Sequence, residues 1–317
     1  MKINKISSNK NTSLKNEYFY KSARDGMYDL LNNMYKEGFV NKLFLPGYIG
    51  WSPKEGSGIF DPINKIEGLE IEYYKMTSEL NINHGDLVER IAKVENQNFA
   101  VLIVNYFGFV DTDIHKISGT IKEYSGWIIE DNAHGYFTYQ NSNEVFSDAT
   151  FFSLHKMFPF QGGGSLVLTN KKLKEFKYFG ETLLETSINP YLYDINEIAN
   201  KRLENYLFLD EILKNKDIGE YISPLKKELQ NGIIPQTYPI VINKGNRDEI
   251  YKLMNDAGYG VVSLYHTLIE PLRSSEYSES YKLSKVIMNL PVHQDVDNKQ
   301  YSEMIKLLLK YCKTTNI

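Results

Sequence analysis

Cysteine is almost absent from this chain of 317 residues, in which Cys312 is the single example. One cysteine excludes a disulfide within the chain, and a reducing compartment, the cytoplasm, is therefore the expected location. The first residues, Met1 to Lys5, have no apolar run behind them, so we expect no secretory signal peptide. No stretch is apolar over the length that a membrane-spanning helix needs, so we expect no membrane partner.

An excess of positive charge is also missing. Lysine and arginine total 36 against 40 aspartates and glutamates, which gives a formal net charge of -4. Proteins that bind nucleic acids usually carry a basic patch, so we expect no nucleic-acid partner. We also expect no metal site. Hydrophobic residues make up 42% of the chain, which is enough for a large core and predicts one large domain or two unequal ones.

The first half of the chain contains short apolar runs without polar alternation. Residues 99–104 and 127–129 are the best examples, and such runs are typical of strands that are buried on both faces. Residues 113–124 between them suit a helix, and this strand–helix–strand order predicts a parallel sheet. The other runs that we expect to form strands are residues 42–45, 149–153 and 165–168.

A helix is expected from Ser22 to about Gly38. The Ser22 side chain can cap its start, Asp25 lies in its first turn, and apolar residues recur at helical spacing from Met27 onward. The preceding residues, 1–18, are polar and predict an ordered or frayed arm.

The composition changes after about residue 173. Helical periodicity continues from there to residue 215, with an interruption at Asn189 and Pro190. Further along, the predicted elements are a strand at 238–242, a helix at 248–257, a strand at 260–262 and a helix at 301–311. We therefore expect a large α/β domain with a mostly parallel sheet over residues 1–200 and a smaller α+β domain over residues 201–317.

Two chemically distinctive residues follow predicted strands. Asp131 follows the run 127–129, and Lys156 lies between the run 149–153 and the glycine turn 162–164. Ligands of open α/β sheets bind at the carboxyl ends of the strands, so we expect both side chains at one site. A lysine amine can form a Schiff base with pyridoxal phosphate, and a carboxylate can keep the cofactor's pyridine nitrogen protonated. The pair therefore predicts a pyridoxal-phosphate enzyme.

Plainer interpretations exist for each of these residues. Lys156 could be a surface lysine, Asp131 a turn cap, and His134 a packed loop histidine. Large aromatic residues such as Trp51 most often belong to a core. His155 is adjacent to Lys156, so on a strand its side chain would point the other way, and a structural role is expected for it.

A longer set of motifs resembles one protein family. Residues 129–134 read Ile-Glu-Asp-Asn-Ala-His, and residues 148–156 read Asp-Ala-Thr-Phe-Phe-Ser-Leu-His-Lys, followed by Gly163 and Gly164. These segments resemble the DegT/DnrJ/EryC1/StrS family of fold-type-I pyridoxal-phosphate-dependent aminotransferases, which typically act on nucleotide-linked keto sugars. Further matches at residues 22–25, 45–48, 104–108, 258–262, 265–266 and 289–293 extend the resemblance over most of the chain from about residue 20.

The resemblance implies an aspartate aminotransferase-like fold and a role for each matching residue. Lys156 would form the Schiff base and move the proton, Asp131 would pair with the pyridine nitrogen, and His134 would lie near the ring hydroxyl. The other implied cofactor contacts are Ser153, Ser22 and Ala23 at the phosphate and Trp51 on the ring, with Tyr48 in reserve. The implied substrate contacts are His266, Tyr48 and Arg24. The family also implies glutamate as the amino donor, which converts the cofactor to pyridoxamine phosphate, and a homodimer.

The chain departs from the family pattern in several places. The segment from Asp148 to Lys156 is two residues shorter than the commonest spacing, and the loop that usually reaches the partner subunit's cofactor has only a poor match at residues 189–191. The amino-terminal helical region is also short. These departures leave open an elimination or lyase reaction on the same cofactor, and a non-catalytic partner or regulatory protein on the same fold. Lys156 argues against the dehydratase branch, which has histidine at this position, although His155 is adjacent.

Overall fold

A seven-stranded sheet forms the larger part of the computed structural model, which describes residues 16–53, 56–94, 98–183, 185–214 and 218–315. Its strand order is β1 (Glu17–Tyr20), β7 (Gly164–Leu168), β6 (Ala149–Ser153), β5 (Trp127–Asp131), β4 (Phe99–Val104), β2 (Lys42–Pro46) and β3 (Glu70–Tyr74). The strands from β6 to β3 are parallel, and β7 pairs antiparallel with both β6 and β1. The central strands are mostly apolar, because helices cover both faces of the sheet.

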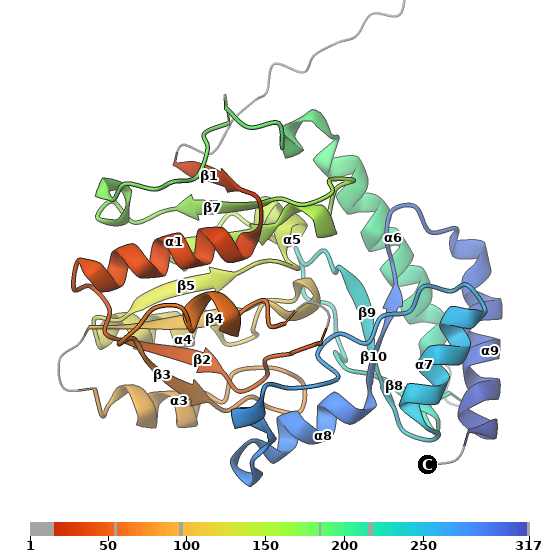
Figure 1. Ribbon diagram of the computed structural model, residues 1–317. Helices are drawn as coiled ribbons and strands as arrows, with labels where there is room; N and C mark the ends of the chain where they lie inside the picture. Colours follow the sequence, from red (N-terminus) through yellow and green to blue (C-terminus); the bar gives the residue numbers. More distant parts are fainter. Residues whose placement is uncertain (1–15, 54–55, 95–97, 184, 215–217, 316–317) are drawn as a thin grey trace, which may run out of the picture.

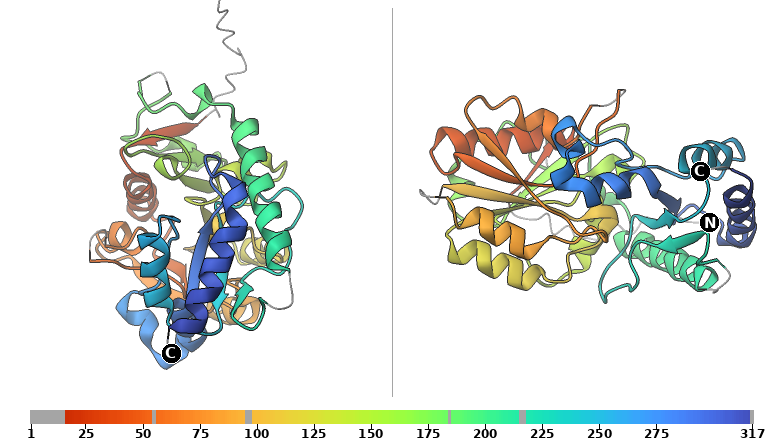
Figure 2. Two further views of the ribbon diagram at one scale, coloured as in Figure 1. Left: turned by 90° about the vertical axis from the view of Figure 1, so that its right-hand side faces the viewer. Right: turned by 90° about the horizontal axis from the view of Figure 1, so that it is seen from below.

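Helix α1 (Ala23–Lys36) covers one face of this sheet and packs against β6 and β7. Helices α3 (His84–Ile91) and α4 (Ile114–Glu123) lie on the opposite face, as Figure 2 shows. Two short helices, α2 (Phe60–Ile63) and α5 (Tyr136–Asn141), belong to the connections. The large sheet is therefore the middle layer of three.

A smaller antiparallel sheet lies beside the large one, at the right of Figure 1. Its strand order is β10 (Ile287–Pro291), β9 (Thr237–Ile242) and β8 (Ile222–Pro224). The long helix α6 (Ile195–Leu213) leads into this part of the chain. The other helices here are α7 (Arg247–Asp256), α8 (Ser278–Val286) and α9 (Tyr301–Thr314). An α/β part with a mostly parallel sheet and a smaller α+β part confirm the predicted fold class.

Several predicted elements agree closely with the structure. Strand β4 occupies the predicted run 99–104, and α1 begins after Ser22, whose hydroxyl oxygen accepts the Asp25 N–H. The glycine turn leads into β7, where the Gly163 φ of 111° lies in the left-handed region that favours glycine. A Cβ on Gly164 would lie 2.3 Å from the Ala23 backbone nitrogen, so the start of β7 can approach α1 only without a side chain there.

Two predicted elements are wrong, and one prediction falls partly outside the described residues. Among residues 173–183 and 185–194, the helical segments before α6 are two short 3-10 turns, Leu173–Glu175 and Pro190–Leu192. The apolar side chains do not form one helical face, because Leu173 and Phe176 pack in the large core while Ile188 and Tyr191 pack on the core around Phe152. Residues 260–262 are not a strand, since only Val262 forms a bridge, to Asn289. Of the expected arm, residues 1–15 lie outside the described residues, and Glu17–Tyr20 form the edge strand β1.

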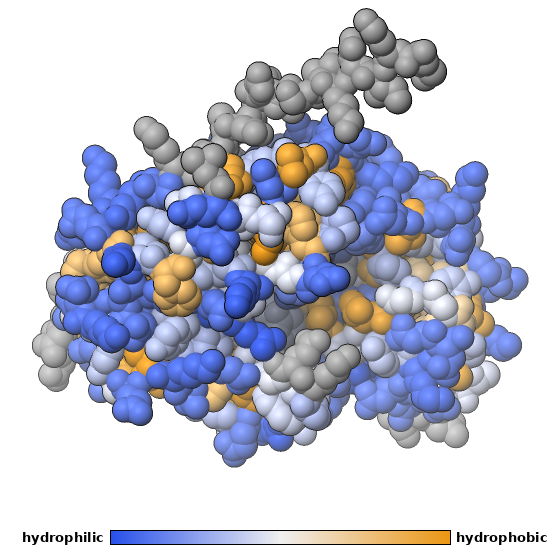
Figure 3. Space-filling model, turned by 45° about the horizontal axis from the view of Figure 1, so that its top comes forward, coloured by the Kyte–Doolittle hydropathy of each residue, from blue (hydrophilic) through white to orange (hydrophobic). Residues whose placement is uncertain are grey.

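Apolar side chains fill a large core that extends through both sheets, and a second core surrounds Tyr136 and Phe152. The face drawn in Figure 3 is mostly hydrophilic, and its hydrophobic residues occur in small, separate groups. Within the described part of the chain, no helix combines the length and the apolar composition that crossing a membrane requires.

Candidate functional site

Strands β5 and β6 end beside a cavity of about 440 Å³. Its walls come from the start of α1, the loop after β2, the segments after β5 and β6, and the loop 263–266 of the smaller part. Carboxyl ends of parallel strands are where open α/β sheets bind ligands, and this volume lies in the range of about 300–1,000 Å³ that small-molecule sites have. The cavity is therefore the candidate functional site.

Lys156 lies in a 3-10 turn, Leu154–Lys156, directly after β6. Its side chain is half-buried in the wall of the cavity, and its Nζ lies 3.0 Å from His134 Nε2. The backbone leaves the sheet at Ser153, where Leu154 N–H donates to the Gly163 carbonyl. The glycine turn thus fixes the segment that carries the lysine.

Asp131 is the last residue of β5, and its side chain is 7% exposed. Its Oδ1 accepts the Ala133 N–H at 2.8 Å. Burial raises the pKa of the Asp131 carboxyl, against the opposing effects of the Ala133 hydrogen bond and the nearby Lys156. Glu130 precedes it on the strand and so faces the other side of the sheet, where it accepts a hydrogen bond from Asn105.

His134 is 3% exposed and has a contact at each ring nitrogen. The Phe107 backbone N–H donates to Nδ1 at 3.2 Å, and Nε2 contacts the Lys156 amine. Burial, with the nearby Lys156 as a smaller cause, holds the pKa of the His134 imidazole well below its usual value. His134 is therefore neutral at physiological pH.

The amino-terminal end of α1 forms another wall of the cavity, where Ser22, Ala23 and Arg24 line it. The first N–H groups of a helix have no partner within the helix, and its dipole is positive at this end. Such an end favours a phosphate or another anion. Ser153, at the end of β6, lines the same cavity and is the second hydroxyl that could contact an anion there.

Residues distant in sequence complete the opposite wall. Trp51, in the loop after β2, is 41% exposed and lines the cavity. His266 and Tyr265 reach it from the smaller part of the molecule, and His266 Nδ1 contacts the Ser263 carbonyl at 2.6 Å. The Nδ1–H must donate to that carbonyl, which leaves Nε2 of a neutral ring as an acceptor.

The structure brings most of the predicted site residues together. The predicted residues that line the cavity are Ser22, Ala23, Arg24, Trp51, Asp131, His134, Ser153, Lys156 and His266. Tyr48 does not line it and is placed differently from the expectation, since its side chain is 0% exposed and packs on Tyr106 and Tyr265. The chain turns after β2 in a way that directs Tyr48 into the core.

The expected strand position of His155 is wrong, and several contributors to the site were missed, among them Ser263 and the Phe107 backbone. His155 lies in a 3-10 turn and not on a strand, so its exposed side chain lines the same cavity as Lys156 and contacts Ser153. Ser263 lines the cavity without any sequence signal. Phe107 was missed because it contributes a backbone N–H, and only its place after strand β4 points to the site.

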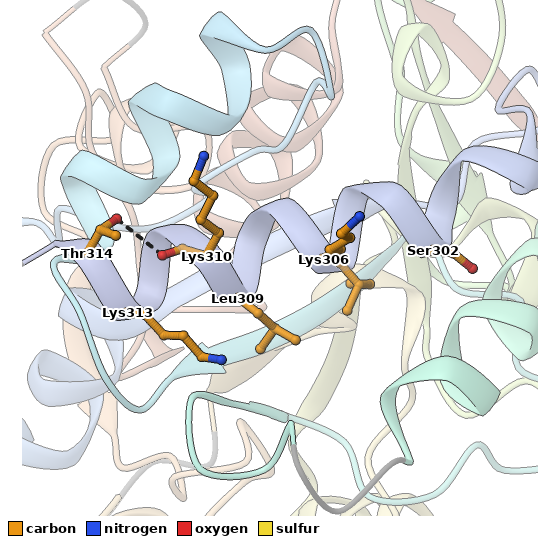
Figure 4. A pocket seen from close by; sticks show the side chains of 7 residues that line it. Ser302, Lys306, Leu309, Lys310, Lys313 and Thr314 are labelled. Atoms are coloured by element: carbon orange, nitrogen blue, oxygen red, sulfur yellow. Dashed lines mark hydrogen bonds between the residues drawn. The ribbon is translucent and has the colours of Figure 1, made fainter.

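A second hollow, of about 540 Å³, lies along α9. Figure 4 shows that the side chains of Lys310 and Lys313 point away from each other, and that Thr314 donates a hydrogen bond to the Lys310 carbonyl. None of the described residues that line this hollow carries a carboxylate, an imidazole or a thiol. It offers no convergent chemistry, and the strand-end cavity remains the candidate site.

No protein-family model and no curated protein match the sequence. Solved structures match it over nearly its whole length. PseC from Helicobacter pylori, an aminotransferase involved in the biosynthesis of pseudoaminic acid, is 18% identical with a TM-score of 0.71, over 94% of this chain and 87% of that one. A DegT DnrJ EryC1 StrS aminotransferase from Brucella abortus is 16% identical with a TM-score of 0.68, over 93% and 85%.

A third solved structure is GDP-4-keto-6-deoxy-D-mannose-3-dehydratase from E. coli with bound hydrated PLP. It is 14% identical with a TM-score of 0.67, over 92% of this chain and 87% of that one. Together these matches show that the chain has the fold of pyridoxal-phosphate-dependent aminotransferases, as the resemblance predicted.

Proposed function

We propose that this chain is a pyridoxal-phosphate-dependent aminotransferase that moves an amino group from glutamate to a nucleotide-linked keto sugar. The observation that carries the proposal is the meeting of the Lys156 amine, the Asp131 carboxylate and the amino-terminal end of α1 in one cavity. The fold supports it, because the Helicobacter and Brucella proteins are aminotransferases and the E. coli dehydratase binds PLP.

The residues of the cavity fit this cofactor chemically. The amino-terminal end of α1, with Ser22 and Ala23, suits a phosphate. A carboxylate in the poorly solvated position of Asp131 suits a protonated pyridine nitrogen, because opposite charges attract strongly where water is scarce. When bound, pyridoxal phosphate supplies an aldehyde that condenses with amines and a ring that withdraws electrons from the attached group.

Each residue then has a defined task. Lys156 would hold the cofactor covalently, and its amine, once the donor amine has displaced it, would move the proton to and from the donor's α-carbon. Asp131 would keep the ring nitrogen charged, and His134 would donate a hydrogen bond beside the ring. Trp51 would shield the cofactor from water, while Arg24 and His266 would bind the anionic parts of donor and acceptor.

We further propose a cytoplasmic homodimer with a domain division at residues 200 and 201. The single cysteine supports the cytoplasm, and the family resemblance supports a dimer. The division would fall inside α6, so this helix would belong to both domains. Sedimentation velocity tests the dimer, which requires twice the mass of one chain.

Elimination is the second candidate reaction. Two observations favour it: the match to the E. coli dehydratase and the position of His155 in the same cavity as Lys156. In that reaction the substrate would carry its own amino group, so no separate amino donor would be needed. Lys156 or His155 would remove a proton from it, and the substrate would release the leaving group on the adjacent carbon.

The test of the proposed function is the visible absorption spectrum of the purified chain with added pyridoxal phosphate. We expect an absorption band from the lysine-bound cofactor, and we expect glutamate to bleach it as the amino group is transferred. Lys156→Ala should form no such band and should lower the rate of the glutamate half-reaction by about 10²–10⁴-fold. Lys116→Ala, a change at an exposed lysine of α4, is the matched control and should behave like the wild type.

The outcomes separate the candidates. Borohydride reduction makes the bond between the lysine and the cofactor permanent. Peptide mapping should then find the reduced cofactor on Lys156. A band that no amino donor bleaches would move the function to elimination. The absence of a band in the wild type would overturn the cofactor proposal and favour a non-catalytic protein on this fold.

A further inference from the structure

His134 has a hydrogen-bond contact at each of its two ring nitrogens, and the two contacts together fix the position of its proton. The Phe107 N–H donates to Nδ1 at 3.2 Å, so Nδ1 carries no hydrogen. A neutral imidazole has one N–H, which must therefore be on Nε2. That nitrogen lies 3.0 Å from the Lys156 Nζ.

The Phe107 N–H is held in place by an unusual backbone conformation. Phe107 has φ 58° and ψ 16°, in the left-handed region that residues with a side chain rarely occupy. Its carbonyl accepts the Gln236 N–H at 2.8 Å, and its buried ring stacks on His134 with 14° between the planes. A conformation of this kind persists where the surroundings impose it, and it is common at functional sites.

The alternative protonation states of His134 conflict with these contacts. An imidazolium would carry a hydrogen on Nδ1, directed at the Phe107 N–H, and the opposite neutral tautomer would do the same. Burial, the larger of the two causes that lower the pKa of His134, acts whether or not Lys156 is charged. Both considerations leave a neutral ring with its hydrogen on Nε2.

The partner of this Nε2–H must accept a hydrogen bond. An ammonium group has three donors and no acceptor, whereas a neutral amine has a lone pair. We propose that the Phe107 backbone N–H, acting through His134, holds Lys156 as a neutral amine in the cofactor-free chain. The functional significance of this inference rests on the proposed function, because only a neutral amine attacks the aldehyde of a cofactor. Phe107 is thus a positioning residue.

Other titratable groups in the cavity wall act on the same amine. They are Asp131, Tyr265, His155, His266 and Arg24. An ionised Asp131 favours an ammonium on Lys156 and so opposes the effect of His134. Burial raises the pKa of this carboxyl, which weakens that opposition, while its hydrogen bond from Ala133 acts in the other direction. Burial also raises the pKa of Tyr265, so this hydroxyl remains neutral. Arg24 adds a positive charge, which disfavours a second one on Lys156.

The first experiment is 15N NMR of the full chain with labelled histidine, freed of bound aldehydes by hydroxylamine treatment. His134→Gln identifies the His134 signals among those of the six histidines. From pH 6 to 9 we expect an unprotonated Nδ1 and a protonated Nε2 for His134. The reverse tautomer, or titration of His134 in this range, would overturn the proposal.

The second experiment measures carbamylation by cyanate, which reacts only with neutral amines. An ordinary lysine has a pKa of about 10.4, so roughly one in a thousand is neutral at pH 7.4. Relative to Lys116 in the same sample, we expect Lys156 to react at least about tenfold faster at this pH. His134→Phe should remove that advantage, and His134→Gln should restore it because an amide N–H can donate to the amine.

The outcome of these experiments does not depend on whether the proposed function is correct. Both use the cofactor-free chain, so they can succeed even if pyridoxal phosphate does not bind. Equal labelling of Lys156 in the wild type and His134→Phe would contradict the inference while leaving the cofactor proposal intact. If His134→Phe does not fold, the carbamylation of Lys156 relative to Lys116 in the wild type remains decisive, because it reports the neutral amine directly.

Discussion

Arg202 of α6 is 1% exposed, and its guanidinium joins three distant parts of the chain. Its Nε donates to Gln294 at 2.9 Å, its Nη1 donates to the Gln236 carbonyl at 3.4 Å, and it lies 5.2 Å from the centre of the Phe137 ring. A planar guanidinium can donate in its plane and stack on an aromatic ring at once. Burial lowers its pKa to about 10, so Arg202 keeps its charge at neutral pH.

Arg202→Lys should therefore destabilise the protein although it conserves the charge. A lysine ammonium is not planar, so it cannot donate to both acceptors and stack on the Phe137 ring at the same time. We expect the free energy of unfolding in urea to fall by about 1–3 kcal/mol. Arg273→Lys, at an exposed arginine, is the control and should change it by less than about 0.5 kcal/mol. Equal effects of the two substitutions would contradict this account of Arg202.

At the scale of elements, the contact between α1 and β7 positions the wall of the cavity that favours anions. Gly164→Ala would place a Cβ 2.3 Å from the Ala23 nitrogen, which forces the strand and the helix apart. Overpacking of this kind typically costs about 1–3 kcal/mol. Gly119→Ala in α4 is the matched control, because a Cβ there has no neighbour within 4 Å, and it should stabilise the helix by up to about 1 kcal/mol.

Thermal unfolding of the two variants measures the contrast. We expect a lower midpoint for Gly164→Ala and an unchanged or higher midpoint for Gly119→Ala. If both shift in the same direction, the close approach of β7 to α1 does not limit stability. A further consequence of Gly164→Ala is weaker phosphate binding, because the first turn of α1 moves away from the cavity.

Elements whose residues share one environment could be predicted from the sequence. Strand β4 is apolar throughout because both of its faces are buried, and α1 carries its own cap in Ser22. Strand β3 was missed because it lies at the edge of the sheet and most of its side chains are only partly buried, which leaves no apolar run. Strand β1 is defined by pairing with β7, about 150 residues further on, and no local pattern contains such a contact.

The same distinction applies to the candidate site. Asp131, His134 and Lys156 could be found because they follow apolar strands and are identified by their side chains. The N–H of Phe107 could not be found, since a backbone group carries no signal of residue type. Tyr48 was misplaced because the direction of a side chain in a loop depends on tertiary packing, here on Tyr106 and Tyr265.

At the scale of the whole molecule, the large sheet separates two sets of buried acids. Asp131 faces the cavity, while Glu130 is 5% exposed on the opposite side, where Asn105 Nδ2 donates to it at 3.1 Å. Burial raises the pKa of the Glu130 carboxyl, against smaller effects of its hydrogen bonds to Ser147 and Asn105. The folded chain therefore holds a proton on Glu130 at a pH where the unfolded chain has lost it.

This difference in proton binding predicts how stability depends on pH. Because the folded-state pKa of Glu130 is raised, its contribution to stability is fully present below the ordinary glutamate value of about 4.3 and is lost as the pH rises toward the folded-state value. Glu130→Gln has no proton to lose, so the stability of the wild type relative to this variant should fall as the pH rises above about 4.3. The fall should be at most about 1.4 kcal/mol for each pH unit, measured by urea unfolding of the cofactor-free chain. Glu123→Gln, at an exposed glutamate of α4, is the control and should follow the wild type at every pH. If the curves of the wild type and Glu130→Gln run parallel, the buried carboxyl titrates as in the unfolded chain, and the sheet does not isolate it from water.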